Sequence, residues 1–274
     1  MIYYSYELIY FNVGSYSSYF GILLIIITIV GYKYLQESPK SLGLPSVGSW
    51  KKELDTKPLL KNFNEVMNNQ LMIIKYPSIW ILGLASSTMY ITRYAINSWG
   101  ILYLQEIRGF SLVEAGSIIG LNTFTGIIGC VAYGFISDKY FDARRPPVTL
   151  IFGIVEIASL FLIFFGPDST VVLTIAFLIY GFTLSGLLAV LGGLFAIDIA
   201  PKNISGAAMG FIGLFSYIGA GLQEKISSLL IKTSTENDTS ALLYNFDDAI
   251  IFWVFASIVS FILSLALWNK KTED

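Results

Sequence analysis

Histidine is absent from the 274 residues of this chain, and cysteine occurs once, at Cys130. The lack of histidine removes the most common metal ligand and the usual proton relay and nucleophile-activating base. A single cysteine excludes a disulfide framework within the chain and a cysteine-based metal site. Charged residues make up only 13%, and a formal net charge of −2 is too small to attract nucleic acid. The sequence therefore predicts no enzyme, no metal or cofactor site and no nucleic-acid partner.

Apolar residues, by contrast, account for 55% of the chain, and the mean hydropathy is +0.67. A helix needs about 20 apolar residues to cross the hydrocarbon core of a bilayer. Seven runs approach or exceed that length, and they cover residues 17–35, 77–104, 112–136, 147–166, 169–194, 203–230 and 248–268. The sequence thus predicts an all-α polytopic membrane protein with about seven transmembrane helices. Glycine and serine interrupt the third, fifth and sixth runs, as is typical of helices that pack closely.

One long polar segment separates the first run from the other six. It divides the chain into an outer segment with one helix (1–35), a cytoplasmic linker (36–75), a six-helix bundle (76–270) and a cytoplasmic tail (271–274). With the linker in the cytoplasm, all but four of the 17 Lys and Arg lie on its side, the four being Arg93, Arg108, Lys225 and Lys232. This distribution follows the positive-inside rule. We expect an integral protein of the bacterial inner (plasma) membrane, with linker and C-terminus cytoplasmic.

Arg93 is the one charged residue between Tyr76 and Gln105. At about 1.5 Å of rise per residue, it lies about 26 Å from Tyr76 and about 18 Å from Gln105, near the middle of the membrane. An arginine there costs roughly 2.5–3.5 kcal/mol on insertion scales, so such residues face a polar cavity or an anionic partner. This position predicts a functional role for Arg93.

A polar stripe surrounds Arg93 on its helix. Ser86, Tyr90, Arg93 and Asn97 are spaced by 4, 3 and 4 residues, which places them on one face. The guanidinium is a planar fork of donors suited to phosphate or carboxylate. The stripe therefore predicts the wall of an anion-binding cavity.

A buried acid is the alternative partner for Arg93. The acids within or near the runs are Glu156, Asp198 and Glu224, of which Glu156 lies deepest. A pair between Arg93 and Glu156 would lock helices together and bind nothing. Replacing both residues tests this alternative, because a structural pair predicts that the double variant recovers the folding lost in the single one.

Four segments occur in an order that resembles a known family. They are ESPKSLGLP at 37–45, RYAINSWGILYL at 93–104, GFISDK at 134–139 followed by Arg144 and Arg145, and AIDIAPKNISGAAMGFIGLFSYIGAG at 196–221. Together they resemble the second half of the organophosphate:phosphate antiporters of the major facilitator superfamily. That group includes glycerol-3-phosphate and hexose-phosphate transporters and a related sugar-phosphate sensor. The resemblance implies that the first run is the sixth helix of a twelve-helix fold and that the other six form its C-terminal half.

The resemblance also implies a phosphate site. Arg93 matches the arginine that binds the phosphate group on the seventh family helix, and Tyr90 matches a tyrosine of the same cavity. Tyr217 resembles the cavity tyrosine of the eleventh helix, although packing within the bundle is an equal explanation for it. Asn97 completes the candidate substrate-binding set on the strength of the stripe alone.

The loop with Asp138, Lys139, Arg144 and Arg145 resembles the cytoplasmic loop that the superfamily carries between paired helices. Asp138 is suited to accept from helix-terminal amides or an arginine, and the basic residues to bridge neighbouring helix ends. We expect this loop to govern gating without touching substrate. An ordinary solvated basic loop is the alternative.

Two departures from the family leave the function open. The stretch from Gly181 to Gly193 lacks the Gly-Pro and the cavity tyrosine of the tenth family helix, and the first five helices, with a second phosphate-binding arginine, are absent. The leading hypothesis is a transporter that exchanges a sugar phosphate or glycerol 3-phosphate for inorganic phosphate. The second is a sugar-phosphate sensor that signals to a membrane partner such as a kinase. The third is a partial chain that awaits its N-terminal half. A channel is weaker, because no ring of like charges supports selectivity.

Overall fold

The computed structural model describes residues 21–34, 43–45, 67–68, 70–201, 204–235 and 242–268. The chain forms two compact units, residues 1–61 and 62–274, and the division falls within the predicted linker. In the first unit the described helix is Gly21–Tyr34, and its isoleucine and leucine side chains are exposed. Most of the predicted linker and the whole predicted tail, 271–274, lie outside the described residues.

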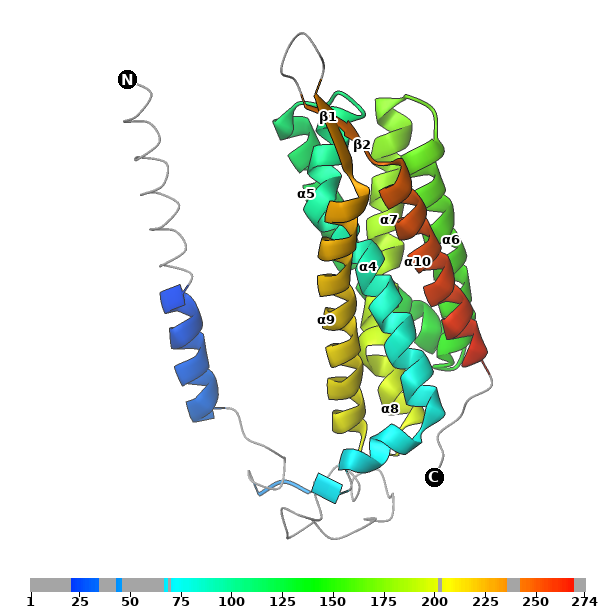
Figure 1. Ribbon diagram of the computed structural model, residues 1–274. Coiled ribbons are helices and arrows are strands. Elements are labelled where there is room, and N and C mark those ends of the chain that lie inside the picture. The colour runs from blue at the N-terminus through cyan, green and yellow to red at the C-terminus, as the bar shows by residue number, and fades with distance from the viewer. Residues whose placement is uncertain are drawn as a thin grey trace. The chain divides into compact units, whose positions relative to one another are not determined.

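The second unit is a bundle of long helices (Figure 1). A 3-10 turn, η2 (Met72–Lys75), leads into this bundle. Its helices are α4 (Pro77–Glu106), α5 (Leu112–Tyr140), α6 (Arg145–Phe165), α7 (Thr170–Ala189), α8 (Phe195–Ile199), α9 (Ser205–Leu230) and α10 (Asp247–Ala266). A π-helical turn, η3 (Val190–Leu194), joins α7 to α8, and the three make one continuous helix over Thr170–Ile199.

By length and composition, five of the described helices can cross a membrane: α5, α6, the continuous helix α7–η3–α8, α9 and α10. Helix α4 has 30 residues, about 45 Å of helix, but it is less apolar. Its serines, threonines and Arg93 account for this difference. The prediction of an all-α polytopic membrane fold is confirmed for the bundle.

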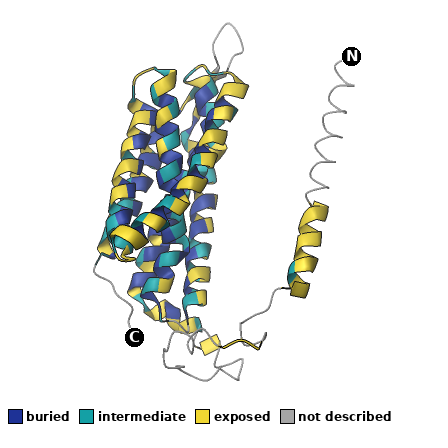
Figure 2. Cartoon of the chain, turned by 180° about the vertical axis from the view of Figure 1, so that it is seen from behind, coloured by how far each residue is buried: buried dark blue, intermediate teal, exposed yellow. Residues whose placement is uncertain are grey.

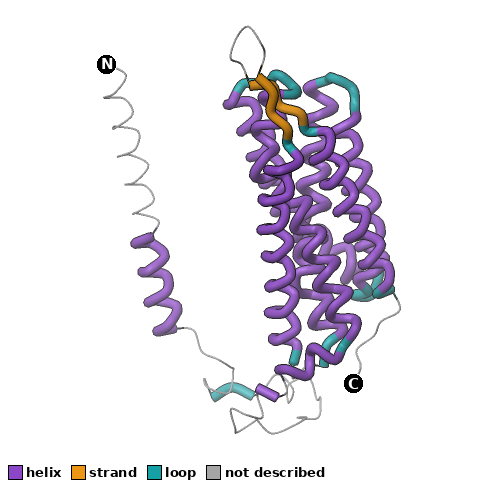
Figure 3. Tube along the Cα trace, viewed as in Figure 1, coloured by secondary structure: helices purple, strands orange, loops and turns teal. Residues whose placement is uncertain are grey.

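The sequence did not predict the short β-hairpin between α9 and α10 (Figure 3). Strand β1 (Lys232–Thr235) pairs antiparallel with β2 (Leu242–Asn245), with Lys232 opposite Asn245. The Lys232 ammonium donates to Asp248 Oδ2 at 2.6 Å, and this hydrogen bond, with the charge of Asp248, raises the pKa of Lys232. The hairpin thereby fixes the connection to the start of α10.

Local signals explain where the helices begin. Pro77 is the first residue of α4, where its missing N–H costs no hydrogen bond. A capping box begins α5: Ser111 Oγ accepts from the Glu114 N–H at 3.3 Å, and Glu114 Oε2 accepts from the Ser111 N–H at 2.9 Å. Prolines again occupy the first turn of α6. These signals are short-range, so the sequence shows them directly.

Helix pairs at close range build the core. Helix α5 packs on α7, α4 packs on α9 and α10, and α6 packs on α7 and α10. At the α5–α7 crossing, a Cβ on Gly129 would overlap the Phe182 carbonyl, so only glycine permits this approach. Buried residues face the inside of the bundle, and exposed residues cover its outer surface (Figure 2). In a membrane protein that outer surface contacts lipid or another helix.

Candidate functional site

Arg93 lies halfway along α4 and is half-buried. Its guanidinium carbon is 5.6 Å from the ring centroid of Tyr90 and 5.7 Å from that of Tyr94. These cation–π contacts offset part of the cost of burying the charge. Among the described residues, no carboxylate forms an ion pair with Arg93. Within the part of the chain that the structure describes, the guanidinium therefore has no carboxylate paired with it.

A pocket of about 480 Å³ opens beside Arg93 between α4, α5 and α7. Arg93 and Asn97 line it from α4. The opposite side consists of residues from α5 and α7, namely Thr123, Gly126, Ile127, Cys130, Val131, Leu184, Ser185 and Leu188. One cationic group thus faces a surface that is apolar apart from a few neutral polar side chains, a combination suited to an anion with an organic part.

The structure brings three of the four predicted substrate-binding residues into one cluster. The ring of Tyr90 lies 5.8 Å from that of Tyr217 in an edge-to-face arrangement, and Arg93 lies over Tyr90. Tyr217 extends from α9 and is 65% exposed, so it is not a packed core residue. Asn97, the fourth, shares the pocket with Arg93.

Ser86 does not belong to this site, and the prediction that it lines the cavity is wrong. It is 0% exposed and forms a 2.7 Å hydrogen bond with Ser216 Oγ. The cause is packing: α9 covers this end of the stripe. Helical spacing alone could not reveal which part of the stripe another helix would cover.

Glu156 has a hydrogen-bond partner other than Arg93. It is 0% exposed on α6 and accepts a hydrogen bond from Ser257 of α10, while its Oε1 has no hydrogen-bond partner among the described residues. Tyr180, equally buried, donates to the Thr92 carbonyl at 3.1 Å. The proposed lock between Arg93 and Glu156 is not formed in this structure.

The predicted gating residues lie at the end of the bundle where α5 joins α6, and two of them, Asp138 and Arg145, are in contact. Arg145 donates to Asp138 Oδ1 at 3.2 Å through Nη1 and to Asp198 Oδ2 at 3.3 Å through Nε. Its side chain thus links the ends of α5, α6 and α8. Lys139 lies over the rings of Phe135 and Tyr140, at 5.1 and 5.7 Å. Arg144 is exposed and has no ion pair among the described residues.

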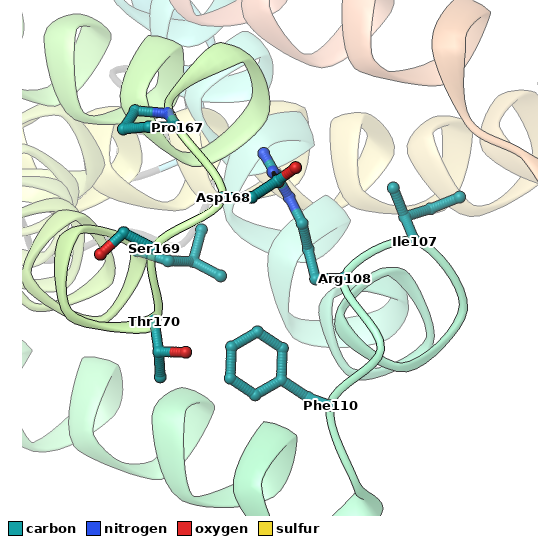
Figure 4. Close-up of a pocket in the computed structure, with 8 residues that line it drawn as sticks. Ile107, Arg108, Phe110, Pro167, Asp168, Ser169 and Thr170 are labelled. Carbon is teal, nitrogen blue, oxygen red and sulfur yellow. Dashed lines mark hydrogen bonds and ion pairs between the residues drawn. The ribbon is translucent and has the colours of Figure 1, made fainter.

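A second arginine cluster lies at the opposite end of the bundle, where α4 and α6 end. Figure 4 shows Arg108 beside Asp168. Arg108, from the α4–α5 loop, forms an ion pair with Asp168, and its Nη2 donates to the carbonyls of Ile163 and Phe164 at 2.9 and 3.2 Å. Its Nε donates to Tyr103 Oη at 3.2 Å. Because all three guanidinium nitrogens already donate, this cluster caps α6 and is not a second anion site.

The sequence missed the pocket residues on α5 and α7. Thr123, Gly126 and Ser185 lie in runs whose small residues indicated close packing, and that interpretation was incomplete. Small residues at a helix crossing also leave space beside it. Their alignment with Arg93 across three helices was the missing information, and no local pattern contains it.

Arg93 thus lies halfway along the first of the six long helices of the bundle, beside a pocket and remote from the loops, in a helical membrane protein. The Major Facilitator Superfamily model matches residues 8–223, and the chain belongs to this family. It is 33% identical over 212 residues to the membrane sensor protein UhpC of Escherichia coli strain K12, which covers 74% of this chain and 47% of that protein. It is 28% identical over 274 residues to the glycerol-3-phosphate transporter of Bacillus subtilis strain 168, covering 92% and 56%.

A third relative is the probable hexose phosphate transport protein of Chlamydia trachomatis serovar D, with 29% identity over 219 residues, 73% of this chain and 47% of that protein. These proteins belong to the organophosphate:phosphate antiporter group, as the sequence segments predicted. The chain spans about half the length of the curated relatives it matches, and the matched part is their C-terminal half. The glycerol-3-phosphate and hexose phosphate relatives are transporters and not enzymes, whereas UhpC is a membrane sensor.

Proposed function

We propose that this chain provides one phosphate-binding half of a transporter that exchanges a phosphorylated organic solute, a sugar phosphate or glycerol 3-phosphate, for inorganic phosphate. The observation that carries the proposal is the half-buried Arg93, which has a pocket beside it and no carboxylate paired with it among the described residues. A charge near mid-membrane faces a polar cavity or an anion, and a phosphoryl group matches its fork of donors. The names of the relatives favour phosphate esters as the anion.

Alternating access needs two halves that rock around a site at the membrane midplane. The chain spans about half the length of its relatives, so in this proposal a second helical half completes the cavity opposite Arg93. The bilayer and that second half are the required partners.

A sensor of the same fold is the second candidate, and the 33% identity to a membrane sensor protein is the observation that favours it. In that role, phosphate-ester binding at Arg93 shifts the fold between two states, and a membrane partner such as a kinase detects the change. No net exchange is required.

Exchange of labelled phosphate by the full chain in proteoliposomes distinguishes the two. Vesicles contain unlabelled phosphate, glycerol 3-phosphate or glucose 6-phosphate, and empty vesicles are the control. Uptake that depends on an internal phosphate compound supports the exchanger. Saturable binding without uptake supports either the sensor or a transporter half without its second half, and the absence of both contradicts a phosphate site in the isolated chain.

We also propose that the linker and C-terminus are cytoplasmic. Lys75, Lys139, Arg144 and Arg145 lie at one end of the bundle, whereas the hairpin with Lys232 is at the other (Figure 1).

In a Cys130→Ser background, we expect Lys232→Cys to react with a membrane-impermeant thiol reagent in intact cells. Lys139→Cys should react only after permeabilisation. The reverse pattern would place the linker outside.

The Arg145 network supports a role in gating. Its hydrogen bonds to Asp138 and Asp198 link the ends of α5, α6 and α8. We expect Arg145→Gln to slow exchange by about tenfold, because charge-assisted hydrogen bonds are worth ~1.5–3 kcal/mol. Phosphate affinity should stay unchanged, because the network does not contact the pocket. Arg144→Gln is the matched control, with wild-type rates expected. Equal loss in both variants would indicate a general effect of loop charge.

A further inference from the structure

The pocket beside Arg93 has a second side, made by α5 and α7, that is not needed to bind the phosphate group. We call the pocket residues of these two helices the α5–α7 wall. Inorganic phosphate needs only the guanidinium and its immediate neighbours. A pocket of about 480 Å³ is larger than this ion requires, so the wall is available for the organic part of an ester.

Ser185 is the polar group that the fold holds in place on this wall. At the α5–α7 crossing, a Cβ on Gly126 would overlap Ser185 Oγ, so the glycine lets the hydroxyl lie against α5. Within the described residues, Ser185 Oγ has no hydrogen-bond partner, whereas the nearby Thr183 hydroxyl donates to the Ile179 carbonyl at 2.9 Å. The Ser185 hydroxyl thus lies in the pocket against α5 and is available for a hydrogen bond to a ligand.

The other polar groups of the pocket are limited. Thr123 Oγ1 donates to the Ile119 carbonyl at 3.1 Å, which leaves this hydroxyl only as an acceptor. Asn97 offers an amide from the Arg93 side. The remaining side chains are apolar or Cys130, and they leave a ligand hydroxyl unpaired.

We propose that the α5–α7 wall binds the carbon skeleton of the phosphate ester and that Ser185 is its specificity-determining residue. The ligands that the wall favours are phosphate esters of short polyols. Their one or two hydroxyls form hydrogen bonds with Ser185, Thr123 or Asn97. A hexose phosphate carries several more hydroxyls, and each one placed against the apolar side chains loses its hydrogen bonds to water. This inference rests on the proposed phosphate site at Arg93.

The test is displacement of labelled inorganic phosphate from the purified full chain in lipid nanodiscs, with glycerol 3-phosphate and glucose 6-phosphate as competitors. We expect glycerol 3-phosphate to bind about tenfold more tightly or better, since an apolar surface rejects added hydroxyls by up to about 100-fold. Ser185→Ala should weaken glycerol 3-phosphate by about five- to tenfold, the value of one hydrogen bond. Phosphate itself should bind unchanged, because it has no carbon skeleton.

Ser117→Ala is the matched control: it removes a serine hydroxyl from the exposed face of α5, where it donates only to the Val113 carbonyl. Cys130 supplies a second readout, because the single cysteine of the chain is exposed and lines the pocket. Glycerol 3-phosphate should slow its alkylation in the wild type, and at the same concentration much less in Ser185→Ala.

Three results would overturn the inference. Glucose 6-phosphate could compete as well as glycerol 3-phosphate, Ser185→Ala could weaken phosphate and ester equally, or it could weaken neither. In each case phosphate binding that still depends on Arg93 leaves the proposed function intact. If the wild-type chain binds no phosphate at all, that result would contradict the proposed function and this inference together.

Discussion

Arg93→Lys is expected to lower phosphate affinity by about 10- to 100-fold and to abolish measurable exchange. Lysine keeps the positive charge but replaces the planar fork with a single ammonium group, so the paired hydrogen bonds to two phosphate oxygens are lost. Hydrogen bonds to charged groups contribute ~1.5–3 kcal/mol each, which sets this range. The cation–π contacts with Tyr90 and Tyr94 are available to either cation, so the bundle should fold normally.

The measurement is phosphate affinity and exchange on the same preparation, with thermal stability recorded for each variant. Arg144→Lys is the matched control, because Arg144 is exposed and outside the Arg145 network. Wild-type affinity in Arg93→Lys would show that charge alone binds the anion. A large fall in stability together with affinity would assign Arg93 to the scaffold instead.

Gly129→Ala is expected to destabilise the bundle by about 3 kcal/mol or more. The added methyl group would occupy the position of the Phe182 carbonyl, and a backbone atom cannot rotate away as a side chain can. Helices α5 and α7 would have to separate along their crossing, which loses packing that drives association in a membrane. Because the pocket lies at the same crossing, phosphate binding should fall as well.

Gly134→Ala provides the comparison on the same helix, since nothing lies within 4 Å of the position its Cβ would take. This variant should match the wild type in thermal unfolding and in size-exclusion profile, or gain slightly from the higher helix propensity of alanine. Equal stability of the two variants would show that α5 and α7 are further apart than the structure indicates.

The helix bounds were predictable to within about two residues where local signals mark the start of a helix. The predicted runs 77–104, 147–166 and 248–268 became α4 (Pro77–Glu106), α6 (Arg145–Phe165) and α10 (Asp247–Ala266). Prolines and acidic first turns act within a few residues, so the sequence contains them. The position of Arg93 beside a pocket was predictable for a related reason. An isolated charge in a long apolar run costs free energy wherever its helix packs.

The other residues of the candidate site depend on which helices pack against each other. Ser86 and Asn97 belong to the same stripe, yet one is sealed by α9 and the other lines a pocket. In a membrane both the packed and the lipid-facing sides of a helix are apolar, so periodicity does not separate them. Ser185 had no distinguishing neighbour in sequence and became a candidate only through Gly126 of another helix.

The π-helical turn at Val190–Leu194 bears on how the two ends of one membrane helix are set relative to each other. A π turn holds an extra residue, and in a helix with 3.6 residues per turn one residue corresponds to about 100° of rotation. The azimuth of Ser185 toward the pocket and that of Asp198 toward Arg145 are therefore fixed by this turn, not by a continuous α-helical phase. A chain lacking one residue here could point the ligand wall or the charge network inward, but not both.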